Sequence, residues 1–253
     1  MHSEKMLEKI SFSDAIEKAS VSEATRGGIG TYGEKMLHRT LKFYFEPDES
    51  KHEITCFGSV ADIRNDDGII EVQTRSFNKL VPKLERFLPL EKVTVVCPII
   101  ENKRIRRIDI ESGESLPPRK SAKRGKAIHA LSELSMIRCF IPHDNLTVLV
   151  MLVNVDETRL LSGKIRVGRK LTSKINCIPT SLGSVMELKS IDDYRLLLPL
   201  DMPESFTALE FEKISGLRGI GAHGALMLLL QLGILTRERK GNQAYSYTLT
   251  NIK

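Results

Sequence analysis

The sequence is short of cysteine: it has four in 253 residues, and no two of them form a Cys-x-x-Cys pair. This spacing gives no support to a zinc site. Three of the four lie in apolar, strand-like or helix-end surroundings, which predicts buried free thiols in a reducing cytosol. The four positions are Cys56, Cys97, Cys139 and Cys177.

Long apolar runs are also missing. The longest are Leu146–Val153 and Ala225–Leu230, and both are far shorter than the ~20 residues that a membrane-spanning helix needs. Residues 1–20 carry charges throughout and contain no apolar core of a secretory signal. The sequence therefore predicts a soluble, cytoplasmic protein without a membrane partner.

Positive charge is concentrated in one segment. The chain has a formal net charge of +6, and residues 103–126 alone contain nine Lys or Arg against three acidic residues. Such a segment favours a polyanionic partner, with nucleic acid as the natural one and an anionic membrane as the weaker alternative. A second basic stretch, Ser162–Lys174, contains no acidic residue. The candidate backbone contacts of the first segment are Lys103, Arg104, Arg106, Arg107, Arg119, Lys120, Lys123 and Arg124.

The run Ser59–Arg75 predicts a β-hairpin around Asn65-Asp66-Asp67-Gly68. A four-residue loop would pair Arg64 with Ile69 and place Asp62 opposite Glu71. A two-residue Asp67-Gly68 loop would place Asp62 opposite Gln73, with Glu71 as the diagonal neighbour. Both registers leave the two carboxylates on one side of the sheet, close enough to repel. A bound divalent cation would turn that repulsion into a chelate of hard oxygen ligands.

Asp62, followed nine residues later by Glu71-Val72-Gln73, resembles the core of the PD-(D/E)xK nuclease superfamily. That pattern has an Asp entering a hairpin, an Asp/Glu-x-Lys on the second strand and often a Glu from a preceding helix, a role that Glu34 fits. The resemblance covers residues 30–110. The sequence departs from the pattern at Gln73, where Lys is usual, and at Val60-Ala61, which replaces a proline-containing entry.

The resemblance implies a restriction-endonuclease-like α/β fold, with a mixed sheet flanked by helices, and metal-dependent hydrolysis of DNA phosphodiester bonds, in some cases as a homodimer. Asp62 and Glu71 would hold one or two Mg²⁺ or Mn²⁺ ions, with Glu34 and the Val72 carbonyl as further ligands. Gln73 would position the attacking water. Glu34 has a second interpretation, because Thr31-x-x-Glu34 is also a capping box.

The order of expected elements agrees with such a fold. A helix over 31–45, a strand over 53–57, the hairpin, a helix over 76–88 and strands over 93–100 and 104–110 follow one another. The Ser-, Gly- and Pro-rich basic loop 111–126 is expected to be mobile. A helix over 127–138 and strands over 146–155, 185–188 and 194–198 complete a nuclease-like domain of residues 31–200, preceded by a helical lead over 1–30.

Residues 203–253 change character and resemble a winged helix-turn-helix domain. Helices are expected over 205–217 and 222–232, followed by a hairpin over 234–249. The resemblance implies that the second helix enters the major groove at residues 219–224, which offer few base-reading groups. We therefore expect backbone contact or a protein–protein role more than sequence reading. The basic residues of the wing are Arg237, Arg239 and Lys240.

Two alternatives to a nuclease remain open at this stage. The chain could be a catalytically inactive, nuclease-like protein that binds nucleic acid or regulates, with Gln73 in place of Lys as the first sign of lost activity. The hairpin could also be purely structural, with Arg64 and Arg75 neutralising Asp62 and Glu71 across the strands.

Overall fold

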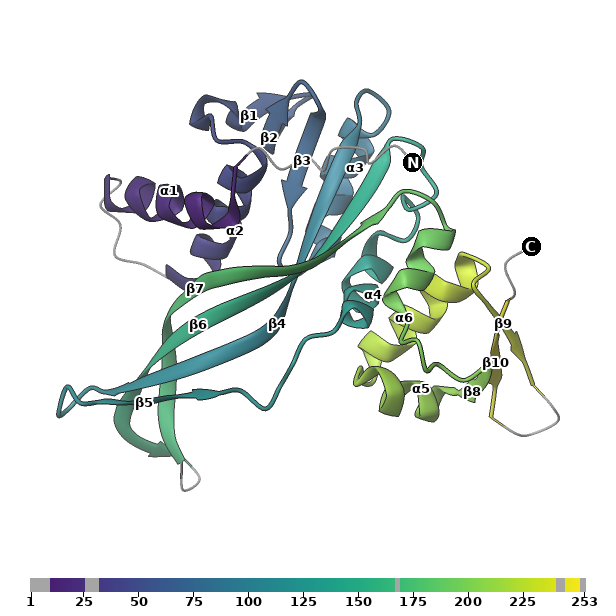
Figure 1. Cartoon of the computed structure of the whole chain (residues 1–253). Helices are drawn as coiled ribbons and strands as arrows, with labels where there is room; N and C mark the ends of the chain where they lie inside the picture. The colour runs from purple at the N-terminus through teal and green to yellow at the C-terminus, as the bar shows by residue number, and fades with distance from the viewer. Residues whose placement is uncertain (1–9, 26–31, 167–168, 240–243, 251–253) are drawn as a thin grey trace.

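The computed structural model describes residues 10–25, 32–166, 169–239 and 244–250. These residues form a large mixed sheet flanked by helices, followed by a smaller three-stranded sheet near the C-terminus (Figure 1). The mixed α/β architecture expected from the sequence is confirmed.

The elements have the following bounds. The α-helices are α1 (Phe12–Thr25), α2 (Tyr32–Phe45), α3 (Val81–Phe87), α4 (Ala130–Leu134), α5 (Ala208–Ser215) and α6 (Ile220–Gln231). The strands are β1 (His52–Cys56), β2 (Ser59–Asn65), β3 (Gly68–Val72), β4 (Val93–Asp109), β5 (Ser115–Lys120), β6 (Leu146–Arg166), β7 (Arg169–Leu188), β8 (Ser205–Thr207), β9 (Leu235–Glu238) and β10 (Ser246–Leu249). Short 3₁₀ helices cover Glu49–Lys51, Phe77–Leu80, Ala127–His129, Ser135–Ile137 and Asp192–Leu197.

The large sheet has the strand order β1-β2-β3-β4-β6-β7, with β5 paired to the outer part of β4. Strand β4 runs parallel to β3 and to β6, and the remaining pairs are antiparallel. Central parallel strands are covered on both faces, which explains the continuous apolar run at the start of β4. Residues 93–98 are all buried.

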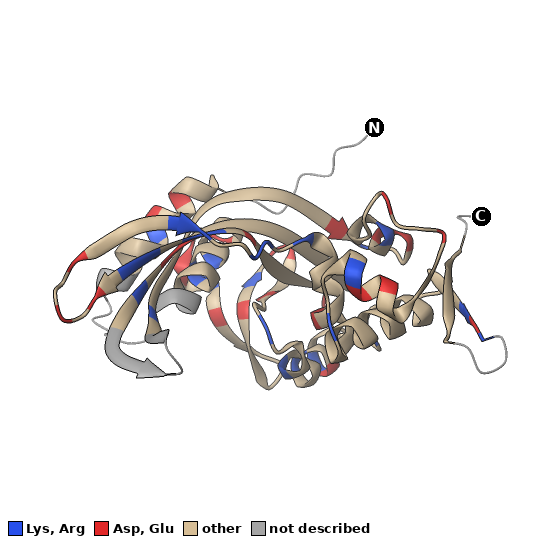
Figure 2. Ribbon diagram, turned by 90° about the horizontal axis from the view of Figure 1, so that it is seen from below, with Lys and Arg blue, Asp and Glu red and all other residues tan. Residues whose placement is uncertain are grey.

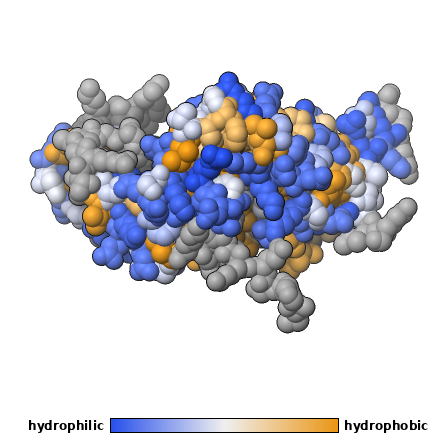
Figure 3. Space-filling view, turned by 90° about the horizontal axis from the view of Figure 1, so that it is seen from above, coloured by the Kyte–Doolittle hydropathy of each residue, from blue (hydrophilic) through white to orange (hydrophobic). Residues whose placement is uncertain are grey.

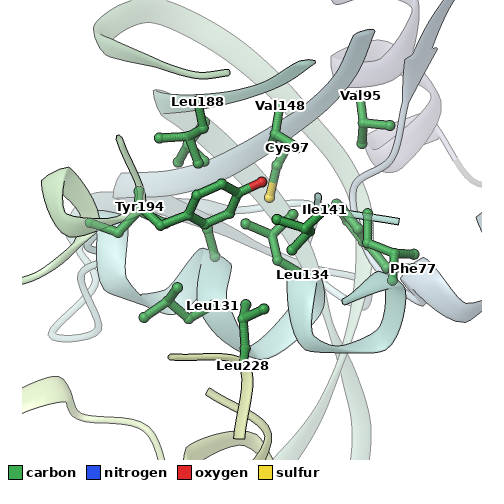
Figure 4. Close-up of a cluster of buried hydrophobic side chains, with 14 of the residues drawn as sticks. Phe77, Val95, Cys97, Leu131, Leu134, Ile141, Val148, Leu188, Tyr194 and Leu228 are labelled. Carbon is green, nitrogen blue, oxygen red and sulfur yellow. The ribbon is translucent and has the colours of Figure 1, made fainter. Parts of the chain in front are cut away.

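Helices cover both faces of this sheet. On one face α1 and α2 bury their inner stripes against Ile63, Ile70 and Val96. The stripe of α2 consists of Leu37, Leu41 and Tyr44, as the helical spacing predicts. The other face packs against α3 and α4, and Figure 4 shows part of this cluster of buried side chains.

The second cluster continues into the C-terminal helices. Phe211 of α5 and Leu228 of α6 belong to the same buried cluster as Leu131 and Leu134 of α4; Figure 4 shows Leu228 with these two leucines. Helix α6 closely approaches the 3₁₀ helix that follows α4 at Gly224, where a Cβ atom would lie 2.5 Å from the Ser135 Oγ. The face seen from above is mostly hydrophilic, with separate apolar areas (Figure 3).

The prediction of a mobile loop over 111–126 is wrong for its central part. Strand β4 continues without interruption to Asp109, and β5 pairs with it antiparallel. The physical reason is that β3 leaves β4 at the Val72–Val96 pair, so the outer half of β4 offers a free edge that β5 covers. We call residues 97–120 together with the described part of 154–182 the arm. Helices α1 and α2 pack against its base, where Val155 and Cys177 are buried, and its far end extends away from the helices in Figure 1.

The prediction of a strand over 194–198 is also wrong. Residues Asp192–Leu197 form a 3₁₀ helix that buries Tyr194 and Leu197. These two side chains are three residues apart, and this spacing places them on one side of a helix with three residues per turn. The helix expected over 205–217 begins only at Ala208, because Ser205–Thr207 pair with β10 as strand β8. The remaining expected helices and strands have counterparts in the structure, with β6 and β7 much longer than expected.

Candidate active site

The β2–β3 hairpin fixes the register of the two carboxylates. Arg64 pairs with Ile69 and Asn65 with Gly68, which is the pairing that places Asp62 opposite Glu71. The turn is closed by the Asp67 amide, which donates to the Asn65 side chain at 3.0 Å. Gly68 takes a φ of +115°, which is costly for any residue with a Cβ atom.

The two strands separate at the position of the carboxylates. Their regular pairing ends at Ile63–Ile70. Beyond it the Val72 amide donates to the Asp62 carboxylate at 2.8 Å, and the Asp62 amide donates to the Glu71 carboxylate at 3.2 Å. Each carboxylate thus satisfies a backbone amide of the other strand. The predicted proximity of Asp62 and Glu71 is therefore present.

Two helices each add one basic side chain. Lys83 Nζ of α3 lies 2.7 Å from Glu71 Oε2, and His38 Nε2 of α2 lies 3.1 Å from Asp62 Oδ2. Helical spacing over residues 76–88 predicts Lys83 on the outer side of its helix, and this prediction is wrong because the side chain contacts Glu71. A cation close to the carboxylates is thus supplied from α3, whereas the superfamily pattern has it on the strand at position 73.

The surroundings give the two carboxyl groups different proton affinities. Burial and the charge of Asp62 raise the pKa of Glu71 to about 7, although Lys83 opposes the shift. Burial also disfavours the charged form of Asp62. The hydrogen bond and charge of His38, with Lys83 and the Val72 amide, outweigh that effect and hold the pKa of Asp62 below its usual range.

Gln73, Glu34 and Arg64 are further residues for which the sequence suggests a role at the carboxylates. The Gln73 side-chain amide donates to the Arg75 carbonyl and, at 3.4 Å, to the Ser76 carbonyl, so it also ties down the chain after β3. Glu34 belongs to α2, but its side chain lies outside the described residues. Arg64 pairs with Glu91 and does not neutralise Asp62, contrary to the purely structural interpretation of the hairpin.

The carboxylates open into a cleft of about 910 Å³ between α2 and α3. Its basic lining contrasts with the acidic pair at its floor, and this combination suits a phosphate-bearing ligand that also needs a cation. The cleft is lined by Asp62, Glu71, Val72 and Gln73, by the basic residues His38, Arg39, Lys42, His52, Arg75, Lys79 and Lys83, and by Phe43, Glu49, Glu53, Thr74 and Ser76.

The donor atoms of the cleft fit a hard divalent cation. Two carboxylates and the Val72 carbonyl supply oxygen ligands only, which Mg²⁺ prefers. Within the described residues, no cluster of three or more His, Cys, Asp or Glu side chains could hold a metal ion. Any further protein ligand would therefore come from the backbone or from a side chain outside the described set, such as Glu34.

The predicted nucleic-acid contacts are divided between the two faces of the arm. Lys103 Nζ lies 2.7 Å from Glu157 Oε2, and the Glu157 side chain is 1% exposed. Because side chains alternate along a strand, Arg104 and Arg106 lie on the opposite face, and both are exposed. Arg107 lies on the Lys103 face.

The remaining predicted nucleic-acid contacts lie on β5, on the segment after it and in the C-terminal part of the chain. Lys120 pairs with Arg104, and Arg119 with Ile105, so Lys120 shares the Arg104 face and Arg119 does not. Lys123 is exposed, and Arg124 Nε donates to the Asn102 side chain at 2.8 Å. In the C-terminal sheet, Arg237 and Arg239 lie over the Tyr245 ring at 4.4 Å and 5.3 Å. Lys240 lies outside the described residues.

Residues 35–189 match the family model described as "Domain of unknown function (DUF8091)". The chain belongs to this family. The matched region includes both carboxylates, Lys83 and the arm, and it ends with β7. An uncharacterized protein of Treponema pallidum (strain Nichols) is 29% identical over 226 residues, covering 87% of this chain and 86% of that protein. No solved structure matches. Among the described helices, none has the length and apolarity needed to cross a bilayer.

Proposed function

We propose that this protein is a metal-dependent deoxyribonuclease with a restriction-endonuclease-like core of the PD-(D/E)xK kind. The observation that carries the proposal is the pair Asp62 and Glu71, which two separating strands bring together in a basic cleft. The order of the surrounding elements, helix α2, strands β1 to β3, helix α3 and strand β4, supports the same assignment.

Asp62, Glu71 and the Val72 carbonyl would hold Mg²⁺ or Mn²⁺, with Glu34 as a further candidate. A cation bound there supplies neutralisation of phosphate charge and a lower pKa for the attacking water. Lys83 takes the place of the lysine that the strand lacks at position 73, because its ammonium lies against the carboxylate of Glu71. Gln73 shapes the wall of the cleft through its contacts with the Arg75 and Ser76 carbonyls.

We further infer that residues 203–253 form a winged-helix-like unit whose contribution to binding comes from Arg237 and Arg239 of the wing. The packing of α6 supports this division of roles. Near its start, Gly221 faces Ser132 of α4 and Gly224 faces Ser135 of the 3₁₀ helix that follows α4, so the start of this helix serves packing more than base reading.

The decisive experiment compares metal-dependent cleavage and metal-dependent stability. Wild-type protein with Mg²⁺ or Mn²⁺ should cut DNA, and Asp62→Asn should lose at least ~10²-fold in rate because a neutral amide replaces a negatively charged metal ligand. The metal should raise the melting temperature of the wild type and not that of Asp62→Asn. Lys83→Met should lose a comparable factor in rate, whereas Lys79→Met, on the rim of the same cleft, should lose less than ~10-fold.

Other outcomes separate the alternative. DNA binding without cleavage under every metal condition, and without a metal-dependent rise in melting temperature, would favour a catalytically inactive nuclease-like protein that binds nucleic acid. The departure at Gln73 is the sequence feature that favours this second candidate.

A further inference from the structure

The exposed arginines of the arm lie on the same side of the sheet as Glu71. Glu71 pairs with Val95, and Val95 and Cys97 face the core beneath α3 and α4. Between Ile100 and Lys103 the register with β6 shifts, since three steps along β4 match two along β6. This bulge reverses the alternation, so that Arg104 and Arg106, and not Lys103, emerge on the Glu71 side.

The arm begins directly beside the cleft. The amide of Gln73, a cleft residue, donates to the Val96 carbonyl at 2.9 Å, and Cys97 is the first residue of the arm. Strand β4 continues from there to Asp109. At ~3.3 Å per residue this part of β4 spans roughly 40 Å, which is close to one turn of a DNA duplex.

Positive charge is concentrated in the segments that form the arm and in residues 121–126 directly after β5. Residues 103–126 carry an excess of six positive charges, and residues 154–182 have six Lys or Arg against two acidic residues. The whole chain has a net charge of only +6, so the remainder is net negative. Figure 2 shows Lys and Arg along the strands of the arm and acidic residues at its outer turn.

The arm contains no residue suited to stacking on a base. Residues 97–126 and 154–182 include no Phe, Tyr, Trp or His. Sites for single strands combine positive charge with aromatic side chains on which unpaired bases stack. A duplex keeps its bases stacked inside and presents phosphates, which Arg and Lys bind without any aromatic partner.

We propose that the arm binds the phosphate backbone of duplex DNA through Arg104, Arg106 and Lys120. The Arg104 guanidinium is well placed for this, because its pairing with Asp156 is a solvent-exposed contact of 3.8 Å that contributes little in water. The proposal rests on the proposed nuclease function for what happens at the cleft, but binding along the arm needs neither the metal nor the carboxylates.

The test is binding of a labelled duplex of roughly 14 base pairs to the full-length protein in EDTA, measured by anisotropy over a range of salt concentrations. Arg104→Gln with Arg106→Gln should reduce the slope of log Kd against log salt by about two and weaken binding ~10-fold or more near 100 mM salt. The matched control is the double variant Lys92→Gln with Lys189→Gln. Lys92 directly precedes β4 and Lys189 directly follows β7, so both lie at the end of the sheet away from the arm, and this variant should bind as the wild type does. A single strand of the same length should bind at least ~10-fold more weakly than the duplex.

Two results would overturn the proposal: equal affinity for single strand and duplex, or an equal loss of slope in the control variant. Its failure is distinguishable from failure of the nuclease assignment. If the wild type cuts DNA and the arginine variant binds the duplex normally, the proposal for the arm is wrong and the nuclease proposal stands. If the arginine variant loses duplex binding but the wild type never cuts DNA, the nuclease proposal is wrong and the proposal for the arm stands.

Discussion

Glu71 carries its carboxyl group in a buried position beside Asp62, and Lys83 offsets only part of the cost of ionising it. The pKa in the folded protein is about 7, against 4.5 for an ordinary glutamate. Between these values the folded state holds a proton that the unfolded state has lost. Stability therefore falls as the pH rises through this window and levels off above about pH 7.

We predict that Glu71→Gln removes this fall. In EDTA the unfolding free energy of the wild type should fall relative to that of the variant by of the order of 1–3 kcal/mol between pH 5 and pH 8. Urea denaturation at several pH values measures the difference. Asp62 does not interfere, because its lowered pKa confines its own contribution to more acidic pH. Equal slopes for wild type and variant would show that Glu71 ionises at its ordinary pKa.

At the same scale, the two carboxylates could be predicted from the sequence and Lys83 could not. Asp62 and Glu71 follow from local rules, since alternation along two short strands and a turn signal determine their side of the sheet. The sequence predicts one α-helix over residues 76–88. It begins as a 3₁₀ turn over Phe77–Leu80, whose three residues per turn rotate the later side chains relative to an unbroken α-helix. This rotation places Lys83 against Glu71.

Among the elements, the β2–β3 hairpin depends on one glycine. A Cβ atom on Gly68 would lie 2.5 Å from the Lys92 carbonyl oxygen, and the residue has a φ of +115°. We predict that Gly68→Ala costs roughly 2–4 kcal/mol of unfolding free energy, because backbone strain and a steric clash with the main chain add together. Denaturant unfolding measures this cost.

The matched control is Gly113→Ala in the β4–β5 turn. Gly113 also has a positive φ, of +70°, but nothing lies within 4 Å of the added carbon, so this variant should lose only ~1 kcal/mol. Equal losses in the two variants would mean that the approach of the Lys92 carbonyl contributes nothing.

The arm is the element that the sequence revealed least. Its strands carry basic and apolar residues on both faces, and its bulge between Ile100 and Lys103 decides which arginines share the Glu71 side. Strand pairing between residues 104 and 120, or between 109 and 161, joins segments whose partners no local pattern identifies. Composition alone favoured a loop over 111–126, because Ser, Gly and Pro are common there.

At the scale of the molecule, a single apolar cluster joins the large sheet to the C-terminal helices. Leu228 of α6 is fully buried in the cluster that contains Val148 of β6 and Leu131 of α4. We predict that Leu228→Ala costs ~2–5 kcal/mol and that it lowers hydrogen-exchange protection in both β4 and α6, since the two regions share one core.

Leu209→Ala in α5 is the control, because this side chain is 71% exposed and its removal should change stability by less than ~0.5 kcal/mol. Lower protection in α6 with unchanged protection in β4 after Leu228→Ala would show that the C-terminal helices unfold independently.

Strand β5 forms the outer border of the arm, and all six of its residues are exposed. An unprotected border of this kind invites strand addition by another chain and hence aggregation. Pro117 and Pro118 occupy the middle of β5, where they remove two amide donors, and Arg119 and Lys120 add like charges that repel a second copy. Strand β5 is therefore an exposed edge strand whose prolines and positive charges protect the protein against forming intermolecular sheets.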